Sequence, residues 1–262
     1  MDKQQDVIRV VPLESGILQL NLNRPEQRNA LSHETLATLL QILQTAKADA
    51  SVKAILLMGE GKAFCAGADI NQLAGLTGPS ALEFARFGQT VFRYLELLGK
   101  PSLAAMHGCA FGGGCELAMA TTLRLAATNT IFGQPEIKLG VIPGFGGTQR
   151  LARLIGKGRA LEICLTGRRF TAEEALQWGF LNEITSPENL LVRAKALLTE
   201  IVQFGTVALQ GILSTIHYGY DLSMEEACEL EAAQFGLCCT TADKLEGVSA
   251  FLEKRPAVFN GK

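Results

Sequence analysis

Residues 108 to 119 read Gly-Cys-Ala-Phe-Gly-Gly-Gly-Cys-Glu-Leu-Ala-Met, and residues 132 to 147 read Phe-Gly-Gln-Pro-Glu-Ile-Lys-Leu-Gly-Val-Ile-Pro-Gly-Phe-Gly-Gly. Each stretch places a glutamate, Glu116 or Glu136, beside glycine-rich turns in mostly apolar surroundings. Glycine lets a ligand approach the main chain, and the residues after Gly114 can continue as a helix. The N-terminus of a helix offers unpaired N–H groups and the positive end of a dipole, which suit an oxygen that gains negative charge. The two stretches together predict an acid–base pair of carboxylates next to an oxyanion hole.

Each glutamate, taken singly, also has a simpler interpretation. Glu116 could be a carboxylate that a helix dipole stabilises by about 0.3–1 kcal/mol, and Glu136 could be a loop residue in solvent. Their joint occurrence with the glycine turns, with Ala68 and with the Pro143-Gly144 pair favours the catalytic interpretation. The glutamates lie 20 positions apart (136 − 116) with one expected strand between them, so both can lie on the same face of a sheet.

The hydrophobic pattern alternates between strands and helices up to about residue 205. Short apolar runs typical of strands occur at 7–11, 17–22, 53–58, 102–106, 123–127 and 181–184. Helices are expected from the N-cap residue Ser32 to about 48, and at 78–98, 146–155, 158–166 and 172–178. Because strand, turn and helix recur, the sequence predicts a layered α/β fold with parallel pairing.

The chain from about residue 187 onward has the pattern of helices only. Ser223 and Glu226 form the sequence signature of a capping box, and Thr241 is expected to cap a final helix. We therefore expect an α/β core over residues 1–205 and a helical region over residues 206–262. A small amphipathic region buries little apolar surface alone, so it is expected to pack on a neighbouring element or another subunit.

Composition and charge exclude several classes of protein. The 262 residues are 48% hydrophobic and 19% charged, which supports a sizeable core and argues against disorder. A formal net charge of −2 gives no basic field for nucleic acid or an anionic membrane. Basic residues do cluster between Arg150 and Arg169, and we interpret them as a solvated face of helices rather than a basic pocket.

Seven cysteines are present, with no C-x-x-C pair, and most lie in apolar stretches. This usage is typical of buried thiols in a reducing compartment, not of a disulfide framework or a zinc site. The first six residues contain no apolar signal core, and the chain has no uncharged apolar run of about 18 residues. The sequence thus predicts a soluble, cytoplasmic protein without a metal.

Three motifs in combination resemble the enoyl-CoA hydratases of the crotonase superfamily. They are Ala-Gly-Ala-Asp at 66–69, Gly-Gly-Gly-Cys-Glu at 112–116, and the segment from Pro135-Glu136 to Gly-Gly-Thr-Gln-Arg at 146–150. The resemblance extends from Asn23 to Arg255. It implies a ββα spiral core whose C-terminal helical region mediates a homotrimer, usually paired into a hexamer.

The resemblance also implies a role for particular residues. The main-chain N–H groups of Ala68 and Gly113 would hold the thioester oxygen, Glu116 and Glu136 would handle water and the Cα proton, and Gly144 would help to place Glu136 and the water. The residues that would contact coenzyme A are Lys62, Ala63, Ala66, Ala68, Asp69, Ile70, Phe251 and Lys254, the last two often from another subunit. Asp69 is not counted as catalytic, because a charge at a helix N-terminus is at least as good an interpretation.

The implied activity is the reversible syn addition of water to a trans-2-enoyl-CoA, giving a 3-hydroxyacyl-CoA. Coenzyme A is then part of the substrate, so no separate cofactor is expected. An enoyl-CoA isomerase is the first alternative, although an isomerase can lose one of the two glutamates and this chain keeps both. A non-catalytic RNA-binding or scaffold relative is the second, and the net charge of −2 disfavours RNA.

Overall fold

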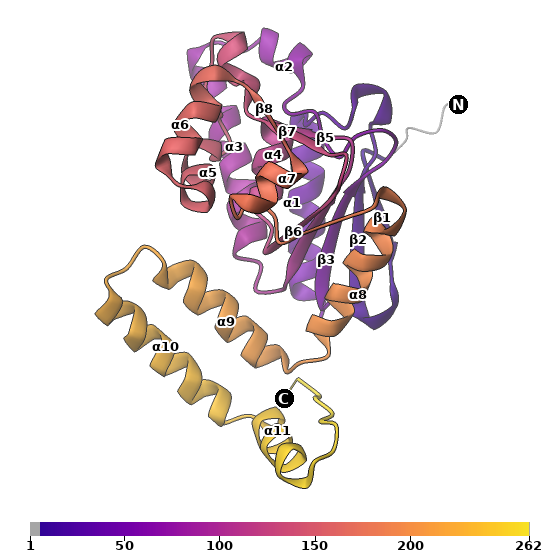
Figure 1. The fold of residues 1–262 in the computed structure, drawn as a ribbon, viewed down its shortest axis with the longest axis vertical. Coiled ribbons are helices and arrows are strands. Elements are labelled where there is room, and N and C mark those ends of the chain that lie inside the picture. Colours follow the sequence, from indigo (N-terminus) through magenta and orange to yellow (C-terminus); the bar gives the residue numbers. More distant parts are fainter. Residues whose placement is uncertain (1–5, 262) are drawn as a thin grey trace.

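The computed structural model describes residues 6–261 and contains two sheets surrounded by helices (Figure 1). The larger sheet has the strand order β1-β2-β3-β4-β6-β9, and only the β1–β2 pair in it is antiparallel. Its strands are β1 (Ile8–Pro12), β2 (Ile17–Leu22), β3 (Ala54–Gly59), β4 (Ser102–Met106), β6 (Leu123–Ala127) and β9 (Glu183–Thr185). The predicted α/β fold with mainly parallel pairing is confirmed.

Helices cover both faces of the larger sheet because its central strands are apolar on both sides. Along β3, Ile55 and Leu57 pack in one core cluster, whereas Leu56 packs in a second cluster on the opposite face. The first cluster includes residues of α1 (His33–Ala48) and α3 (Gly78–Glu96), and the second includes residues of α8 (Leu190–Val202).

A second, smaller sheet has the order β5-β7-β8, and the sequence analysis missed all three of its strands. They are β5 (Cys109–Phe111), β7 (Ile131–Gly133) and β8 (Arg169–Thr171). Phe132, Phe170 and Phe180 pack together beside it with ring centroids 5.2–5.7 Å apart. Because β5 pairs with β7, the two glycine-rich stretches of the sequence become neighbours in space.

The remaining helices of the core lie around this smaller sheet. They are α2 (Ile70–Ala74), α4 (Gly113–Met119), α5 (Gly147–Ile155), α6 (Lys157–Thr166) and α7 (Ala172–Gln177). The expected cap of α1 is confirmed, since the Ser32 hydroxyl accepts from the Thr35 N–H. Thr171 and Glu174 form a capping box on α7.

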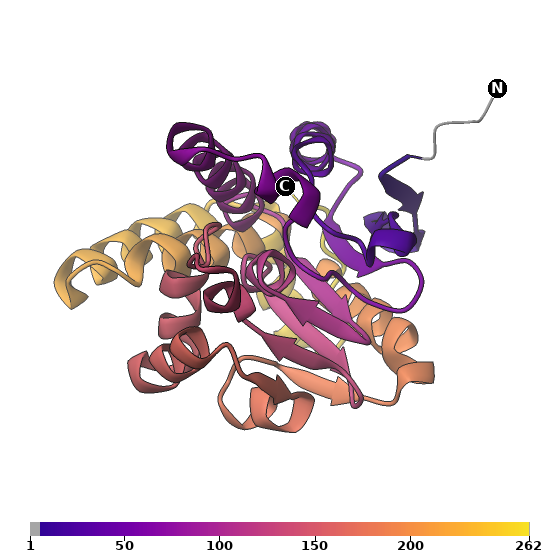
Figure 2. The ribbon, with the colours of Figure 1, turned by 90° about the horizontal axis from the view of Figure 1, so that it is seen from above.

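Three helices form the C-terminal region: α9 (Thr206–Gly219), α10 (Met224–Cys239) and α11 (Ala242–Glu253). Helices α9 and α10 pack side by side as a hairpin that extends away from the core (Figures 1 and 2). The expected caps of Ser223 with Glu226 and of Thr241 are confirmed. The division proposed after residue 205 falls in the turn between α8 and α9.

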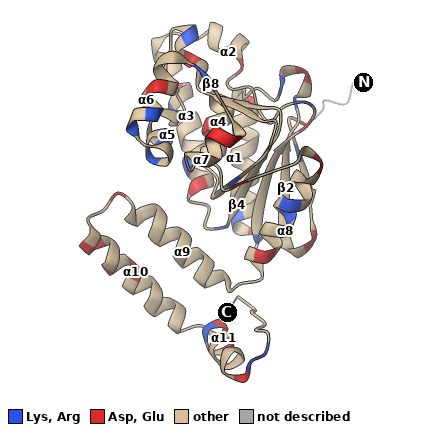
Figure 3. Ribbon diagram, in the orientation of Figure 1, with Lys and Arg blue, Asp and Glu red and all other residues tan. Residues whose placement is uncertain are grey.

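Two expectations about individual side chains need correction. The seven cysteines are free thiols, and Cys65 and Cys115 are buried as expected, but Cys228 and Cys239 are exposed because α10 has no buried residue. Basic residues outnumber acidic ones over α5 and α6 (Figure 3). The interpretation as a solvated face is wrong for Arg150, which is ion-paired with Glu96 and only 15% exposed.

Within residues 6–261 no single helix has the length and apolarity to cross a membrane. Pro187–Val202 and Thr206–Gly219 pass such a test only when joined, and they meet at a 105° bend. The expectation of no apolar leader concerns the first six residues, of which residues 1–5 lie outside the described part of the chain.

We predict that Gly114→Ala destabilises the fold by about 1–3 kcal/mol, because overpacking a filled site has such a cost. A Cβ atom at Gly114 would collide with the carbonyl oxygen of Cys65 and lie 2.6 Å from its Cβ. Urea unfolding of the native chain and the variant measures the difference. Gly158→Ala on α6 is the matched control, since a Cβ there meets no atom within 4 Å. Equal losses in the two variants would contradict the packing argument.

Candidate active site

The N-terminus of α4 is built from glycines that leave space for a carboxylate. Gly112, the N-cap residue, has φ 49° and ψ −123°, a conformation that disfavours any side chain. A Cβ atom at Gly112 would lie 2.6 Å from Oε1 of Glu136. The Glu136 carboxylate is therefore directly beside the turn that starts α4. The N–H of Gly113, in the first turn, has no acceptor within the helix.

The main-chain N atom of Ala68 lies next to Gly113. Leu31 donates its N–H to the Gly67 oxygen at 2.8 Å and accepts from the Asp69 N–H at 3.0 Å. In such a parallel bridge the N–H of the intervening residue, Ala68, points to the opposite side. A Cβ atom at Gly113 would lie 3.3 Å from the Ala68 nitrogen. The structure thus brings together the two amides that the sequence analysis proposed as oxyanion donors.

Glu116 is buried in α4, with 1% of its surface exposed. Its Oε1 atom accepts hydrogen bonds from the N–H groups of Phe145 at 2.8 Å and Gly147 at 2.6 Å. A Cβ atom at Gly147 would lie 2.8 Å from the same oxygen, so only glycine lets this main chain approach. The loop that enters α5 therefore fixes the position of the Glu116 carboxylate.

Glu136 lies in a short 3-10 helix, Pro135–Leu139, directly after β7. With the Gln134 amide oriented so that its nitrogen faces Glu136, it donates to Oε1 at 3.0 Å and to Oε2 at 3.1 Å. Gln134 is fully buried at 0% exposure. The sequence analysis did not single out Gln134, and its position two residues before Glu136 was the only signal.

Burial perturbs both carboxylates, and the charge of Glu136 adds to the effect on Glu116. Burial, together with the nearby charge of Glu136, raises the pKa of Glu116 to about 8, although the N–H groups of Gly147 and Phe145 and the charge of Arg150 oppose the rise. Burial raises the pKa of Glu136 to about 7. Because the two groups interact, they titrate as a pair that holds about one proton near neutral pH. Such a pair can offer one acid and one base at the same time.

The other proposed positioning residue, Gly144, lies in the loop just before Phe145. Its carbonyl oxygen accepts a hydrogen bond from Nε2 of Gln89 at 2.8 Å, which ties this loop to α3. Gly144 is partly exposed, as expected for a residue that would border a substrate.

The segment 62–70 leads to the proposed oxyanion site, with residues 63–65 and 67 buried and the others at least partly exposed. Lys62 and Ile70 are exposed and Ala66 is partly exposed, so these three residues are accessible to a ligand. Ala63 is buried, and its carbonyl oxygen accepts from Nδ2 of Asn29 at 2.8 Å. Ala63 is therefore less accessible to a ligand than the resemblance implies.

Asp69 has a structural role at the start of α2. Its carboxylate accepts from the Asn71 N–H at 3.1 Å and pairs with Nη2 of Arg24 at 2.8 Å. Burial acts to raise the pKa of Asp69, but the Arg24 and Asn71 hydrogen bonds outweigh it and lower the pKa. This arrangement agrees with leaving Asp69 out of the acid–base pair.

The two C-terminal residues proposed to contact coenzyme A lie far from this segment in the same chain. Lys254 ends α11, and Phe251 on α11 is 83% exposed. Helices α2 and α11 lie at opposite ends of the long axis of the molecule (Figure 1). A single chain therefore does not bring Phe251 and Lys254 to the oxyanion site.

No group of three or more His, Cys, Asp or Glu side chains in residues 6–261 is arranged to hold a metal ion. The chemical groups of the site are two carboxylates, main-chain N–H groups and the Gln134 amide.

Comparison with known proteins defines the family. Residues 13–262 match the enoyl-CoA hydratase/isomerase family. The chain is 41% identical to crotonyl-CoA hydratase of Syntrophomonas wolfei over 254 residues, which are 97% of this chain and 98% of that protein. It is 39% identical to short-chain-enoyl-CoA hydratase of Clostridium acetobutylicum over 247 residues, 94% and 95% of the two chains.

Solved structures agree with this assignment. The crystal structure of enoyl-CoA hydratase from Bacillus anthracis superposes with a TM-score of 0.94 at 35% identity, covering 98% of this chain and 100% of that one. An enoyl-CoA hydratase from Geobacillus kaustophilus gives a TM-score of 0.95 at 31% identity, with 99% and 98% covered. The chain belongs to the enoyl-CoA hydratase/isomerase family, and its fold is that of these crotonase-like enzymes.

The raised pKa of Glu116 predicts how stability depends on pH. The folded protein binds this proton more tightly than the unfolded chain, because the pKa rises from 4.5 to about 8 on folding. The contribution to stability is thus fully present below about pH 4.5 and is lost as the pH rises towards 8. We expect Glu116→Gln, which cannot titrate, to lose less stability than the native chain between pH 5 and pH 8.

Urea unfolding at the two pH values measures this difference. Glu200→Gln on α8 is the matched control, since Glu200 is exposed on the opposite face of the sheet, and it should follow the native pH dependence. The same pH dependence in Glu116→Gln and the native chain would contradict a raised pKa at Glu116.

Proposed function

We propose that this chain is an enoyl-CoA hydratase that adds water reversibly to a trans-2-enoyl-CoA and forms a 3-hydroxyacyl-CoA. The observation that carries the proposal is a pair of carboxylates, Glu116 buried and Glu136 partly buried, beside the main chain of Ala68 and Gly113. The names of the two relatives, crotonyl-CoA hydratase and short-chain-enoyl-CoA hydratase, support a short acyl chain as the first substrate to test.

In the proposed reaction, the thioester oxygen of the substrate accepts hydrogen bonds from the N–H groups of Ala68 and Gly113. Attack at Cβ moves negative charge onto this oxygen as an enolate. Fixed donors stabilise that charge as it develops, and loss of one such donor typically costs about 10²–10³ in rate. The short distance of 3.3 Å between the Ala68 nitrogen and a Cβ position built at Gly113 supports this role.

The two glutamates share the proton transfers. The ionised carboxylate takes a proton from water as the water oxygen bonds to Cβ, and the protonated carboxyl gives its proton to Cα. One proton enters the pair and one leaves it, so the pair ends with the same total charge. The pKa values of about 8 for Glu116 and about 7 for Glu136 support one acid and one base near neutral pH. We assign to Gly144 the placement of the water and Glu136.

Coenzyme A would lie along the segment that ends at the oxyanion site. Lys62, Ala66 and Ile70 are accessible for this contact, and Ala68 and the surroundings of Asp69 continue it towards the thioester. Phe251 and Lys254 would reach the same coenzyme A from a neighbouring subunit, which their separation from the site within one chain supports. The reaction itself needs no separate cofactor, and a cytoplasmic location stays a prediction.

We predict that the native chain hydrates crotonyl-CoA, seen as a loss of enoyl-thioester absorbance. Glu116→Gln and Glu136→Gln should each lower kcat by about 10²–10⁴, the usual contribution of general acid–base catalysis. Binding of butyryl-CoA, measured by calorimetry, should survive in both variants because neither carboxylate is needed for it.

The control is Glu200→Gln, which should retain native kcat. If the native chain leaves crotonyl-CoA unchanged and instead converts a 3-enoyl-CoA, the isomerase alternative is correct. If both active-site variants stay fully active, the glutamates are not the acid–base pair. Salt-sensitive RNA retention combined with no turnover of either substrate would favour the non-catalytic alternative.

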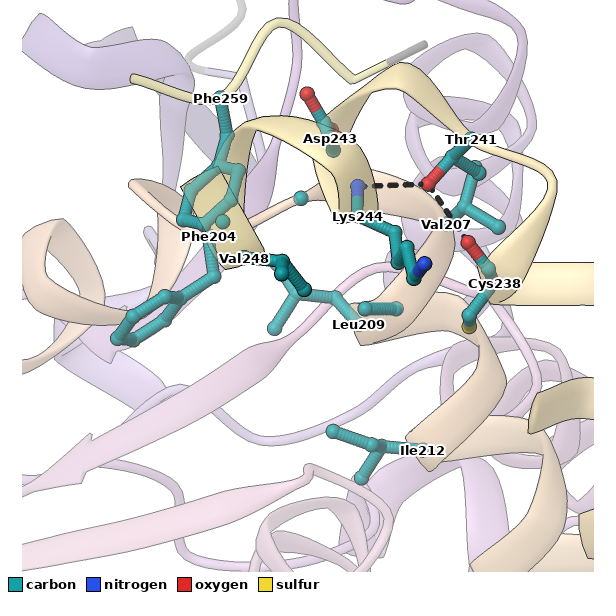
Figure 4. Close-up of a pocket in the computed structure, with 13 residues that line it drawn as sticks. Phe204, Val207, Leu209, Ile212, Cys238, Thr241, Asp243, Lys244, Val248 and Phe259 are labelled. Atoms are coloured by element: carbon teal, nitrogen blue, oxygen red, sulfur yellow. Dashed lines mark hydrogen bonds between the residues drawn. The ribbon is translucent and has the colours of Figure 1, made fainter. Parts of the chain in front are cut away.

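The C-terminal helices support a second part of the proposal, assembly into a homotrimer or a dimer of trimers. Large apolar side chains that are exposed in one chain lie on all three helices, among them Ile212, Ile216, Phe235, Leu245 and Phe251. An apolar cavity of about 440 Å³ opens between the start of α9, the end of α10 and α11, with Phe204, Val248 and Phe259 in its wall (Figure 4). An isolated chain would leave this surface in water.

Solution mass tests the assembly. We expect a particle of three or six times the chain mass of 28.1 kDa in sedimentation or light scattering at micromolar concentration. A monomer under these conditions would show that residues 206–262 do not form a subunit interface, and it would also remove the proposed contact of Phe251 and Lys254 with the coenzyme A of another chain.

A further inference from the structure

The loop that holds Glu116 is itself held by Arg150. The guanidinium Nη1 of Arg150 donates to the carbonyl oxygen of Phe145 at 3.0 Å, while the N–H of Phe145 donates to Glu116. A Cβ atom at Gly146 would collide with Nη1 of Arg150, which shows how closely the side chain covers the loop. Arg150 therefore contacts the same three-residue turn whose N–H groups bind the Glu116 carboxylate.

Arg150 is in turn fixed by a two-point ion pair with α3. Its Nε and Nη2 atoms donate to Oε1 and Oε2 of Glu96, each at 3.1 Å. The two side chains are only 15% exposed, so solvent screens this pair less than a surface pair. The fork geometry of a guanidinium on a carboxylate restricts orientation as well as distance. Arg93 donates to Glu96 from the solvent side at 2.9 Å.

The ring of Phe145 fixes the loop from the other side. A Cβ atom at Gly88 would collide with this ring, so Gly88 provides the space on α3 that the ring occupies. The ring packs edge-to-face against Phe84 and Phe92, with centroids 5.2 and 5.5 Å away. The peptide that carries the Phe145 N–H has its carbonyl oxygen, that of Gly144, bound by Gln89 at 2.8 Å, and the next peptide has its carbonyl oxygen, that of Phe145, bound by Arg150. With the ring packed and both neighbouring peptides bound, the Phe145 N–H has little freedom to turn.

We propose that Arg150, paired with Glu96, is a positioning residue for hydration. Its Nε, Nη1 and Nη2 atoms all donate within the protein, so we assign it no contact with substrate. It holds the turn 145–147 so that two N–H groups stay on Oε1 of Glu116, and its positive charge favours the ionised form of that carboxyl. The proposal rests on the proposed function, because it assigns how one of the two catalytic glutamates is kept in place.

The charged groups around Glu116 and Arg150 determine the expected effect of pH on the rate. Glu136 and Arg150 are the charges that act on Glu116, the first raising and the second lowering its pKa. Glu96 faces Arg150 and Arg93, and His217 of α9 lies near enough to interact with Glu96 and Arg93. Loss of the Arg150 charge therefore raises the pKa of Glu116, and the limb of the pH–rate profile that reports Glu116 moves to higher pH.

The test compares Arg150→Gln, Arg150→Lys and Glu96→Gln in crotonyl-CoA hydration. We expect kcat to fall about 10²-fold in Arg150→Gln, the usual result of displacing a catalytic group by about 1 Å. KM should stay near the native value, because we assign Arg150 no contact with substrate.

The limb of the pH–rate profile that reports Glu116 should move to higher pH in Arg150→Gln. It should move much less in Arg150→Lys, which keeps the charge but cannot bind Glu96 and Phe145 together. Glu96→Gln should lower kcat without the upward shift, since Arg150 stays charged.

Arg153→Gln is the matched control, one turn further along α5. Arg153 pairs with the exposed Asp221 at 3.4 Å and makes no contact with the turn 145–147, so its variant should keep the native profile. Circular dichroism and the urea midpoint verify that each variant is folded at the assay temperature. Native kcat and an unmoved pH limb in folded Arg150→Gln would overturn the proposal, and so would a loss of rate fully explained by unfolding.

A separate measurement distinguishes failure of the positioning role from failure of the proposed function. If the native chain does not hydrate crotonyl-CoA, the function is wrong, but the pH dependence of urea unfolding still reports Glu116. In Arg150→Gln the loss of stability with rising pH should then extend to higher pH than in the native chain. Arg153→Gln should follow the native chain. An identical pH dependence in the three proteins would refute the control of Glu116 by Arg150 without any reference to activity.

Discussion

The buried carboxylate of Glu116 lies near the partly buried carboxylate of Glu136, and the rest of the site depends on how the chain stabilises this pair. Burial disfavours the charge on both groups, and the charge of Glu136 further disfavours the charge on Glu116. The groups in direct contact with Glu116 are main-chain N–H groups rather than cations. Main-chain N–H groups stabilise an ionised carboxylate without adding a fixed positive charge beside it. A cation in direct contact would favour one protonation state, whereas these donors let the pair pass a proton back and forth.

The main chain reaches the carboxylates only where side chains are missing. Gly112 lies against Glu136 and Gly147 lies against Glu116, and a Cβ atom would lie only 2.6 Å and 2.8 Å, respectively, from the carboxylate oxygen. The three-residue strands β5 and β7 bring these turns together, since the Gly112 N–H donates to the Gly133 oxygen at 2.9 Å as the β5–β7 pairing ends. Glycine is therefore required at these positions by the carboxylates as well as by the turns.

The sequence could predict the parts of this arrangement that have a local pattern. Glycine turns beside Glu116 and Glu136, the apolar strands of the larger sheet and the capping residues Ser32 and Ser223 were all recognisable in this way. Strands β5, β7 and β8 were missed because three residues show no periodicity. Arg150 was missed for a different reason. The partner of Arg150, Glu96, is 54 positions away, so within the sequence Arg150 looked like one more residue of a basic helix surface.

The acid–base pair and the proposed coenzyme A contacts depend on different levels of structure. Glu116 lies where α3, α4 and the start of α5 pack together, and proton transfer needs that rigidity because small displacements are costly. Lys62 and Ile70 are on the surface, and Phe251 projects from α11 at the far end of the molecule. A long, charged substrate needs accessible surface rather than a rigid core. The proposed chemistry can therefore be argued from one chain, whereas the proposed α11 part of a coenzyme A site would be complete only if chains assemble.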